Sequence, residues 1–359
     1  MKPTAKYRVI GIMSGTSLDG LDLVCCDYQR KKGRWTFDLI VGETIKYTQI
    51  WTWRLSNAHL LPGVDLQKLD YEFGNFIGIR CKQFIEKHKI KKVDFIASHG
   101  HTVFHQPEKK LTHQIGNGVA IFESSKLPVI NDFRSLDVLK GGQGAPLVPV
   151  GDHHLFADFD VCLNLGGIAN YSLNEKKKRV AADICFTNMG LNYLAGKMEM
   201  KFDKNGKQAA QGVVDVKMLM DLKTIYGKWK STRPSLGRES FEMLIKPLLD
   251  NENISIQNRL RTFCESVSIE IESVIPKRKK KLKVLATGGG AFNQFLIEIL
   301  QSKVVHKAVI IVPHKKIVNY KEAIVFGLLG MLRLKNKINV LKSVTGASTD
   351  TTAGTMIGF

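Results

Sequence analysis

Short apolar stretches alternate along most of the chain with longer segments in which apolar residues recur every three or four positions. Apolar runs of about four to eight residues are typical of buried strands, whereas the longer spacing marks one face of a helix. Residues 257–275 show the helical spacing, because Leu260, Phe263, Val267 and Ile271 fall on one face. The alternation of the two patterns predicts an α/β fold.

The pattern places each expected element between turn-forming residues. The expected strands are residues 8–13, 21–27, 93–98, 128–131, 161–165, 170–173, 180–184, 283–287 and 309–313. The expected helices are residues 65–87, 188–198, 214–222, 238–248, 257–275, 292–303 and 320–335.

Two segments share the order strand, glycine-bearing tight turn, strand. They are VIGIMSGTSLDGLDLVCCDY at 9–28 and VCLNLGGIANYSL at 161–173. Each opens a half of α/β character, so they predict two related domains, each begun by a hairpin whose turn points at a shared cleft. We expect a first domain of residues 1–130 with 344–359 and a second domain of residues 131–343.

The composition is that of an ordinary globular protein, with 44% apolar and 24% charged residues in a chain of 359. This length favours two domains over one core. No apolar run reaches the ~18–20 residues of a membrane span. The N-terminal MKPTAKYRVIGIM has too short an apolar stretch for a secretory signal. We therefore expect a cytoplasmic protein with no membrane partner.

The formal net charge of +20 favours anionic partners such as nucleotides, acidic sugars or nucleic acid. Much of the excess lies in EKKKRV at 175–180 and PKRKKKLKV at 276–284, where we expect turns entering strands. No aromatic residue interrupts these lysines, as a stacking surface for RNA would require. Solvated loops are the favoured interpretation, and nucleic acid is not an expected partner.

The cysteines give no sign of disulfides or a zinc site. None forms a C-x-x-C pair, and most stand inside apolar runs, so buried thiols are expected. They are Cys25, Cys26, Cys81, Cys162, Cys185 and Cys264.

The turn GIMSGTSLDGLD at 11–22 concentrates hydrogen-bonding capacity between two strands. It lacks the lysine of the G-x-x-x-x-G-K-[ST] phosphate loop and continues into a strand, so it is not that motif. Backbone N–H groups in such a turn can form a concave anion site, to which Ser14, Thr16 and Ser17 add hydroxyl donors.

The two aspartates of this turn, Asp19 and Asp22, would repel a bare phosphate. Their presence fits a divalent metal between them and the phosphate, because Mg²⁺ is held by one or two carboxylates together with phosphate oxygens. The alternative is that aspartate and glycine simply form the turn.

The GTSLDGLD turn resembles the first phosphate-binding hairpin of the sugar kinase, Hsp70 and actin superfamily, and specifically that of anhydro-N-acetylmuramic acid kinases. Further stretches across nearly the whole chain carry the same resemblance. They are SHGHTVFHQP (98–107), QIGNGVAIFE (114–123), NDFRSLDVLKGGQGAPLVP (131–149), LNLGGIANYS (163–172), RPSLGRESF (233–241), TGGGAFN (287–293), KEAIVFGLL (321–329) and VTGAS (344–348). The resemblance implies a two-domain, duplicated ribonuclease H-like fold of the actin/Hsp70/sugar-kinase type with an interdomain cleft.

The resemblance implies an ATP-dependent kinase that hydrolytically opens 1,6-anhydro-N-acetylmuramic acid and phosphorylates O6, giving MurNAc 6-phosphate in peptidoglycan recycling. ATP and Mg²⁺ are the implied cofactors, and a homodimer is the implied assembly. In VAADICFTNMGLNYLA, Asp183 matches the family's catalytic base. Asp183 also stands near a strand end, where a carboxylate is well placed for chemistry, although turn or cap use is the alternative.

One segment departs from the family pattern. Thr-Gly-Pro-Gly usually follows the catalytic aspartate, and here residues 184–187 read Ile-Cys-Phe-Thr, while Asp183 and Asn188 remain. The change puts the backbone donors of those glycines in question, and Phe186 is expected to reshape the pocket. A catalytically impaired regulator that binds nucleotide or muramyl ligands is therefore the alternative function.

The remaining site positions are carried over from the resemblance, with three glycines in ATGGGAFN suited to a flat adenosine. The nucleotide-binding positions are Gly15, Thr16, Ser17, Leu18, Asp19, Gly20, Leu21, Asp22, Gly166, Gly167, Gly288, Gly289 and Gly290, with Asp19 also at the metal. The substrate-binding positions are His99, Arg134, Asn188 and Glu322. Arg134 could grip an acidic substrate bidentately, or form an ion pair with Asp132 or Asp137.

The SHGHT stretch also suggests a rival function. His99 and His101 alternate along a strand end, so they are expected to project on one side, as in the H-x-H metal pair of amidohydrolases. The adjacent histidines of GDHHLFADFD at 151–160 point apart in an expected helix, which disfavours such a hydrolase. Glutamine is common in the kinase family where His101 stands, and His99 is then expected to line the sugar pocket.

Overall fold

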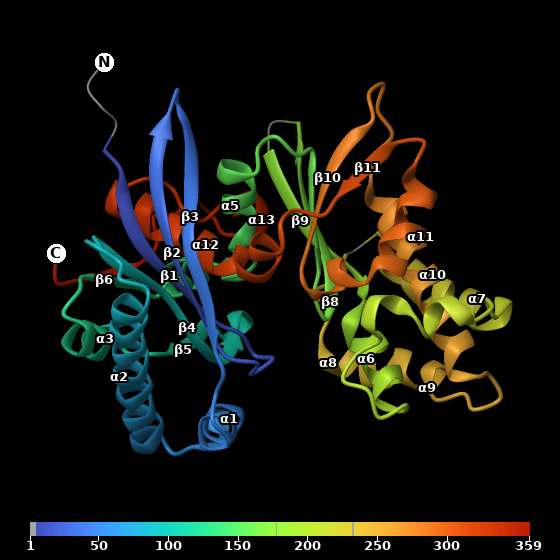
Figure 1. The fold of residues 1–359 in the computed structure, drawn as a ribbon, viewed down its shortest axis with the longest axis horizontal. Helices are drawn as coiled ribbons and strands as arrows, with labels where there is room; N and C mark the ends of the chain where they lie inside the picture. The colour runs from blue at the N-terminus through green and yellow to red at the C-terminus, as the bar shows by residue number, and fades with distance from the viewer. Residues whose placement is uncertain (1–4, 177, 232) are drawn as a thin grey trace. The chain divides into compact units, whose positions relative to one another are not determined.

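The computed structural model describes residues 5–176, 178–231 and 233–359. The chain folds into two compact units, Met1–Phe156 with Tyr320–Phe359 and Ala157–Asn319. Each unit has its own sheet and its own helices (Figure 1). The predicted α/β class is confirmed.

The first unit is built on a mixed sheet with the strand order β12-β6-β4-β1-β2-β3, and β5 pairs with β4. Strands β1, β2 and β3 form an antiparallel ribbon, whereas β4 and β6 continue the sheet in parallel. The predicted first hairpin is confirmed, since Ser14 pairs with Leu21 at its closed end. The strands are β1 (Tyr7–Ser14), β2 (Leu21–Lys31), β3 (Arg34–Ile45), β4 (Phe95–Gln106), β5 (Leu111–Ile115), β6 (Val129–Asn131) and β12 (Thr355–Ile357).

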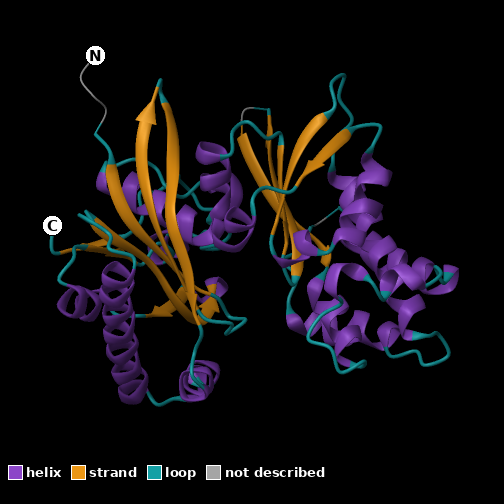
Figure 2. Cartoon of the chain, viewed as in Figure 1, coloured by secondary structure: helices purple, strands orange, loops and turns teal. Residues whose placement is uncertain are grey.

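Helices pack on both faces of this sheet (Figure 2), because side chains alternate along β1. Ile10 and Ile12 join the core formed with α2, whereas Gly11 faces α12. A Cβ on Gly11 would lie 2.0 Å from the carbonyl oxygen of Ala323, so only glycine admits α12 this closely. The helices with residues in this unit are α1 (Gln49–Ser56), α2 (Gly63–Lys87), α3 (Gly118–Ser125), α4 (Ser135–Leu139), α5 (Val148–Leu155), α12 (Lys315–Leu334) and α13 (Lys342–Thr345).

The second unit contains a five-stranded sheet in the order β11-β10-β7-β8-β9. The predicted second hairpin is confirmed as the antiparallel pair β7–β8, and β10 and β11 continue the sheet in parallel. The strands are β7 (Val161–Leu165), β8 (Ile168–Glu175), β9 (Lys178–Phe186), β10 (Leu282–Thr287) and β11 (Ala308–Ile311). The helices are α6 (Asn188–Gly196), α7 (Val216–Trp229), α8 (Arg238–Ser240), α9 (Lys246–Leu249), α10 (Ile256–Val274) and α11 (Gln294–Val304).

All the predicted strands and helices occur, most with ends shifted by a few residues, although β4 extends to Gln106 and α7 to Trp229. The predicted face of α10 is confirmed, since Leu260, Phe263, Val267 and Ile271 are fully buried. The predicted helix 238–248 is divided into α8, a π-helical turn at Phe241–Ile245 and α9. The elements that the sequence pattern missed are β3, β5, β12, α1, α3, α4 and α13, whereas the helix expected around the 151–160 histidines is α5.

The two units differ from the predicted domains in their boundaries. Residues 131–156 and 320–343 were expected in the second domain, whereas they pack with the first unit. The reason is tertiary, because α12 lies directly on β1, β2 and β4. The hydroxyl of Tyr28 donates to the carbonyl of Ile324 at 2.5 Å, and a Cβ on Gly330 would lie 2.8 Å from the side chain of Ala97.

The cysteines and the lysine runs lie where the sequence predicts. All six cysteines are free and buried. The first lysine run forms the β8–β9 turn, with Lys177 outside the described residues, and the second precedes β10. Among the described residues, no helix combines the length and the apolar character that a bilayer crossing demands.

Candidate active site

The turn that closes the β1–β2 hairpin directs its polar groups toward solvent. The N–H of Leu18 donates to the carbonyl of Gly15 at 3.2 Å, and Leu18 is left-handed, with φ of 59°. A Cβ on Gly20 would lie 2.6 Å from the carbonyl oxygen of Ile45, so glycine is required there. Thr16, Ser17 and Asp19 are exposed. The turn therefore offers hydroxyls and one carboxylate to a ligand.

A hydrogen-bonded relay of three residues supports this turn from beneath. The hydroxyl of Tyr47 donates to Oγ of buried Ser14 at 2.7 Å, and Ser14 Oγ lies 3.0 Å from Nδ1 of His101. Burial lowers the pKa of His101 to about 4, so its ring is neutral at pH 7 when it shares this hydrogen bond with Ser14. The relay ties the end of β1 to β4 and to the loop after β3.

Asp22, the first acidic residue of β2, has a carboxyl group with a raised pKa. Thr44 donates to its Oδ1 at 2.5 Å. Burial raises the pKa of Asp22 to about 6, and the nearby charges of Glu322 and Asp19 act in the same direction. A bound cation would relieve this repulsion.

The acids of the turn could hold a metal only with help from other ligands. Within the described ranges, no three histidine, cysteine, aspartate or glutamate side chains gather to hold a metal ion by themselves. One or two carboxylates completed by phosphate oxygens and water are the usual environment of Mg²⁺. Asp19 and Asp22 fit that partial role.

Buried His99 pairs with half-buried Arg134, and this contact defines the tautomer of the histidine. Nε of Arg134 donates to Nε2 of His99 at 2.9 Å, so the ring proton of His99 is on Nδ1 and is donated to the carbonyl of Gly100. Burial and the charge of Arg134 hold the pKa of His99 well below its usual value. Burial lowers the pKa of Arg134 to about 10, opposed by Glu322, so the guanidinium stays charged at pH 7.

The ion pair considered for Arg134 is not formed with either aspartate. Asp137 accepts hydrogen bonds from Gly144 N and from the Thr345 hydroxyl, and Asp132 accepts one from Ser135 N. Both carboxylates hold the chain around α4 instead.

Glu322, about two turns into α12, is the carboxylate whose charge raises the pKa of Arg134. Its side chain keeps contact with solvent, yet many protein atoms surround it, and this desolvation raises its pKa against the pull of Arg134 and Lys321. His99, Arg134, Glu322 and Asp22 thus interact within the first unit.

The expectation that His99 and His101 project on one side is wrong. The His99 ring packs on Phe326 of α12, whereas the His101 ring packs edge-on against Phe73 of α2, on the other face of the sheet. Gly100 between them has φ of 73°, and the β1–β4 register shifts there, so the alternation is interrupted. The two rings cannot form an H-x-H metal pair.

In the second unit the start of α6 is hydrogen-bonded to the turn between β7 and β8. N–H groups of Thr187, Asn188 and Met189 donate to the carbonyls of the β7–β8 turn, Gly166 and Gly167, at 2.8–3.2 Å. These donors at the start of α6 therefore already have partners. The Asn188 amide also donates to the Leu165 carbonyl at 2.9 Å, and fixes the start of α6 on the hairpin.

The glycines of the TGGGAFN stretch lie on the same hairpin. Gly288 has φ of 81°, and a Cβ there would lie 2.5 Å from Oδ1 of Asn164. A Cβ on Gly290 would lie 2.8 Å from the side chain of Leu165, and one on Gly289 would lie 3.3 Å from the Asn188 amide nitrogen. The structure therefore brings Gly166, Asn188 and residues 288–290 together.

Asp183 lies inside β9 rather than at its end, because the strand continues to Phe186. Asn170 pairs with Asp183 and Ala169 pairs with Cys185, so Ile184 is the extra residue of a β-bulge. Bulges redirect neighbouring side chains and are frequent beside active sites. The carboxylate accepts the Leu236 N–H at 2.9 Å, and burial raises its pKa while this hydrogen bond opposes the rise.

The expectation that Phe186 reshapes a pocket is not supported, since its side chain is fully buried in the core of the second unit. Its ring packs edge-on against Phe241, with centroids 5.4 Å apart, and against Trp229. Phe186, one of the residues that depart from the family pattern, is therefore a core residue of the second unit.

Sequence reasoning missed three residues that support these sites. Tyr47 and Thr44 belong to or follow β3, a half-exposed strand that the apolar pattern did not reveal. Leu236 holds Asp183 through its backbone N–H, which no side-chain signal could identify.

The chain is similar to a family model, to curated proteins and to solved structures. The family model described as anhydro-N-acetylmuramic acid kinase matches residues 7–358. The anhydro-N-acetylmuramic acid kinase of Francisella tularensis subsp. novicida is 32% identical, over 95% of this chain and 96% of that protein. The one from Hydrogenovibrio crunogenus is 30% identical, over 96% of each. Component A of the Acidaminococcus fermentans (R)-2-hydroxyglutaryl-CoA dehydratase is a solved structure with a TM-score of 0.47 at 13% identity, covering 90% of this chain and 96% of that one.

Proposed function

Because the chain belongs to the anhydro-N-acetylmuramic acid kinase family, we propose that it opens 1,6-anhydro-N-acetylmuramic acid with water and phosphorylates O6 with ATP. The products are MurNAc 6-phosphate and ADP, which places the enzyme in peptidoglycan recycling. The observation that carries this proposal is the family match over residues 7–358, which includes Asp183 and its supporting contacts. No comparison favours the impaired regulator.

Asp183 is the proposed base. Its Oδ2 is held by the Leu236 N–H, and among the described residues Oδ1 has no hydrogen bond, so one oxygen remains to take a proton. The pKa raised by burial makes the carboxylate a stronger base than an exposed aspartate. In the reaction, Asp183 removes a proton from the water that attacks C1.

The atoms balance without a second carboxylic acid. The C1–O6 bond breaks as water adds to C1, and its electron pair passes to O6. An inverting glycosidase protonates such a leaving oxygen with a general acid. Here O6 is captured by the γ-phosphoryl group, and the bond to the β-phosphate breaks to release ADP.

Backbone and hydroxyl groups of the first turn are the proposed contacts to the ATP phosphates. Thr16 and Ser17 are exposed, and a Cβ on Gly15 would meet no atom closer than 3.5 Å, so the turn has open space beside it. Phosphoryl transfer depends mainly on such positioning and on charge neutralisation. Leu18, Gly20 and Leu21, in or next to this turn, are further proposed contacts to the nucleotide.

Gly166, Gly167 and residues 288–290 are the proposed nucleotide contacts of the second unit. Among residues 288–290, Gly289 has the most open space, because a Cβ there would meet only the Asn188 amide within 4 Å. The carbonyls of Gly166 and Gly167 are engaged with the start of α6, so we assign their remaining exposed backbone to the phosphates and residues 288–290 to the adenosine.

Asp19 and Asp22 are the proposed carboxylates for Mg²⁺, which would neutralise phosphate charge when bound. The elevated pKa of Asp22 supports this assignment, because its cause includes the repulsion from Asp19 and Glu322 that a cation cancels.

Arg134 is the proposed partner of the substrate's lactyl carboxylate. Its Nε is committed to His99 and its Nη1 to the Gly144 carbonyl, so the guanidinium would bind through Nη2 and the second hydrogen of Nη1. His99 then positions Arg134, and Glu322 and Asn188 offer hydrogen bonds to sugar hydroxyls.

The proposed reaction is tested by incubating the protein with ATP, Mg²⁺ and the anhydro sugar in water enriched in ¹⁸O. We expect a 6-phosphorylated reducing sugar that carries the label on C1 and not on phosphate. Label in inorganic phosphate, without sugar product, would show an ATPase and refute the assignment.

The role of Asp183 is tested with Asp183→Asn, and exposed Asp38→Asn serves as a matched control. We expect Asp183→Asn to bind ATP normally and to lose at least a thousandfold in kcat, while Asp38→Asn keeps full turnover. Full turnover by Asp183→Asn would remove this residue from the base role.

A further inference from the structure

A cavity of about 610 Å³ opens in the first unit where β1 begins. Tyr7 from β1, Arg30 from β2 and Trp35 from β3 line it, together with Lys335 and Lys337 after α12. The glycine turn of the β1–β2 hairpin lies at the other end of these strands. Since β1 has 8 residues, at ~3.3 Å per residue the turn is about 23 Å away. The cavity is therefore separate from the candidate active site.

The lining combines cationic, aromatic and apolar groups. Arg30, Lys335 and Lys337 supply positive charge, Tyr7 and Trp35 supply ring faces, and no carboxylate is among the lining residues. Buried Leu332 of α12 adds an apolar wall. A volume of ~300–1,000 Å³ with a mostly apolar lining and a few polar groups is typical of small-ligand sites.

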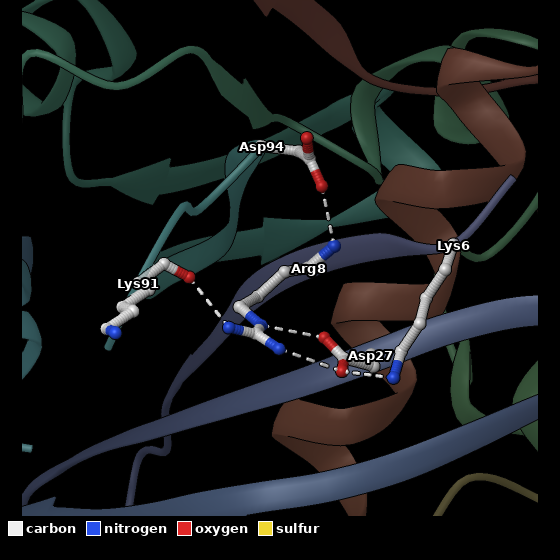
Figure 3. Close-up of polar contacts among 5 residues, drawn as sticks. All are labelled: Lys6, Arg8, Asp27, Lys91 and Asp94. Carbon is white, nitrogen blue, oxygen red and sulfur yellow. Dashed lines mark hydrogen bonds and ion pairs between the residues drawn. The ribbon is translucent and has the colours of Figure 1, made fainter. Parts of the chain in front are cut away.

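The cations that line the cavity differ from two neighbouring cations at the start of β1, Lys6 just before the strand and Arg8 within it. Lys6 Nζ lies 2.6 Å from the Asp27 carboxylate, and Arg8 donates to the same carboxylate at 2.8 and 3.0 Å (Figure 3). Asp27 thus neutralises part of this local charge, and its pKa is held low by Arg8 and Lys6 against the effect of burial.

The partners that two of the cavity cations have are neutral. Nε of Arg30 donates to the Gly33 carbonyl at 3.0 Å, and Nζ of Lys335 donates to the Tyr7 hydroxyl and lies over the Tyr7 ring. In the described part of the chain, Arg30, Lys335 and Lys337 form no ion pair with a carboxylate. Their charges are therefore uncompensated around one concave, partly apolar space.

His154 of α5 completes the wall as a neutral group. Burial lowers its pKa to about 4, and the charges of His153 and Arg30 act in the same direction. At pH 7 its ring offers a hydrogen bond and no charge.

We propose that this cavity is a second ligand site, which binds a flat aromatic ring that carries a phosphate group. The ring packs on Trp35, and the phosphate binds among Arg30, Lys335 and Lys337. Aromatic faces favour such rings, and hydrogen bonds from charged donors to phosphate are the stronger ones in proteins.

The test uses 1-naphthyl phosphate, because it has the ring and the dianion but neither ribose nor adenine. Isothermal titration calorimetry is run at low salt on the whole protein, with 1-naphthol and inorganic phosphate as single-feature probes. We expect 1-naphthyl phosphate to bind at least tenfold more tightly than either probe. Binding no tighter than that of either probe would overturn the proposal.

Variants locate the binding. We expect K335Q/K337Q and, separately, W35L to weaken 1-naphthyl phosphate at least tenfold. K279Q/K280Q removes the same charge from an exposed loop of the second unit and should leave the affinity within twofold. Equal weakening by the control pair would show general attraction to a basic protein. Unchanged binding by both cavity variants, with thermal unfolding like that of the parent, would refute the site.

Discussion

The β1–β2 and β7–β8 hairpins share one sequence pattern but use their turns differently. In the first, residues 15–20 form an open turn whose Thr16, Ser17 and Asp19 face solvent. In the second, the carbonyls of Gly166 and Gly167 accept hydrogen bonds from the start of α6, and residues 288–290 pack on the strands beside it. A shared strand–turn–strand motif thus forms an open turn in one unit and a turn packed against neighbouring segments in the other.

The supports beneath the two turns also differ in kind. The first rests on the polar relay of Tyr47, Ser14 and His101, which hydrogen bonds hold in register. The second is backed by the apolar core that includes Phe186 and Phe241. Substitutions in the second hairpin should therefore lower stability as well as nucleotide binding, whereas those in the first should change mainly nucleotide binding.

Phe186→Ala should have the largest effect. Removing a fully buried phenyl ring leaves a cavity, which costs about 3–5 kcal/mol. We expect the melting transition to fall by many degrees while the KM for ATP of the surviving folded enzyme changes little. Calorimetry and kinetics at low temperature measure both. A stable Phe186→Ala protein would show that this ring is not part of the support.

Gly288→Ala and Gly15→Ala form a matched pair that sharpens the contrast. Gly288 has a positive φ and its Cβ would clash with Asn164, so we expect a loss of about 3 kcal/mol in stability. Gly15 has open space, so Gly15→Ala should keep its stability and raise the KM for ATP. Thermal unfolding of the two variants, with ATP kinetics, decides the question. The reverse ranking of stabilities would contradict the proposed division of roles.

Asp22→Asn should change the pH dependence of stability. The folded pKa of Asp22, about 6, lies above its unfolded value near 3.8, so the folded state binds more protons between these values. Stability from this group is present below pH 4 and is lost as pH rises through 6. We expect the variant to be more stable than the parent at pH 8 by about 1–2 kcal/mol, with the gap closing near pH 4. Unfolding without added metal is measured at both pH values, and a gap independent of pH would argue against a shifted pKa.

Tyr47→Phe should have the smallest effect. It removes one hydrogen bond to Ser14, worth about 1 kcal/mol, and loosens the base of the first turn. We expect a modest drop in melting temperature and a few-fold rise in the KM for ATP. Tyr71→Phe, at a half-exposed position on α2, is the control and should change neither. If both variants behave like the parent, the relay does not position the turn.

Much of the fold was predictable because local periodicity is a direct consequence of burying one face. The two hairpins and the α10 face were read in this way, and all three are confirmed. The half-exposed strand β3 was missed, because its residues are mostly intermediate or exposed and show no apolar run. For the same reason Thr44, in β3, and Tyr47, just after it, were not predicted as supports of the first turn.

The sequence by itself determined the class of fold, the hairpins and the chemistry available in their turns, because each depends on residues close together in the chain. Only the tertiary structure decided where His99, Asp183 and Phe186 point. The left-handed Gly100 and the bulge at Ile184 reset the alternation of side chains, and residue spacing does not record such changes. It likewise decided that α12 packs with the first unit, since this packing depends on Gly11 and Tyr28, about 300 residues earlier in the chain.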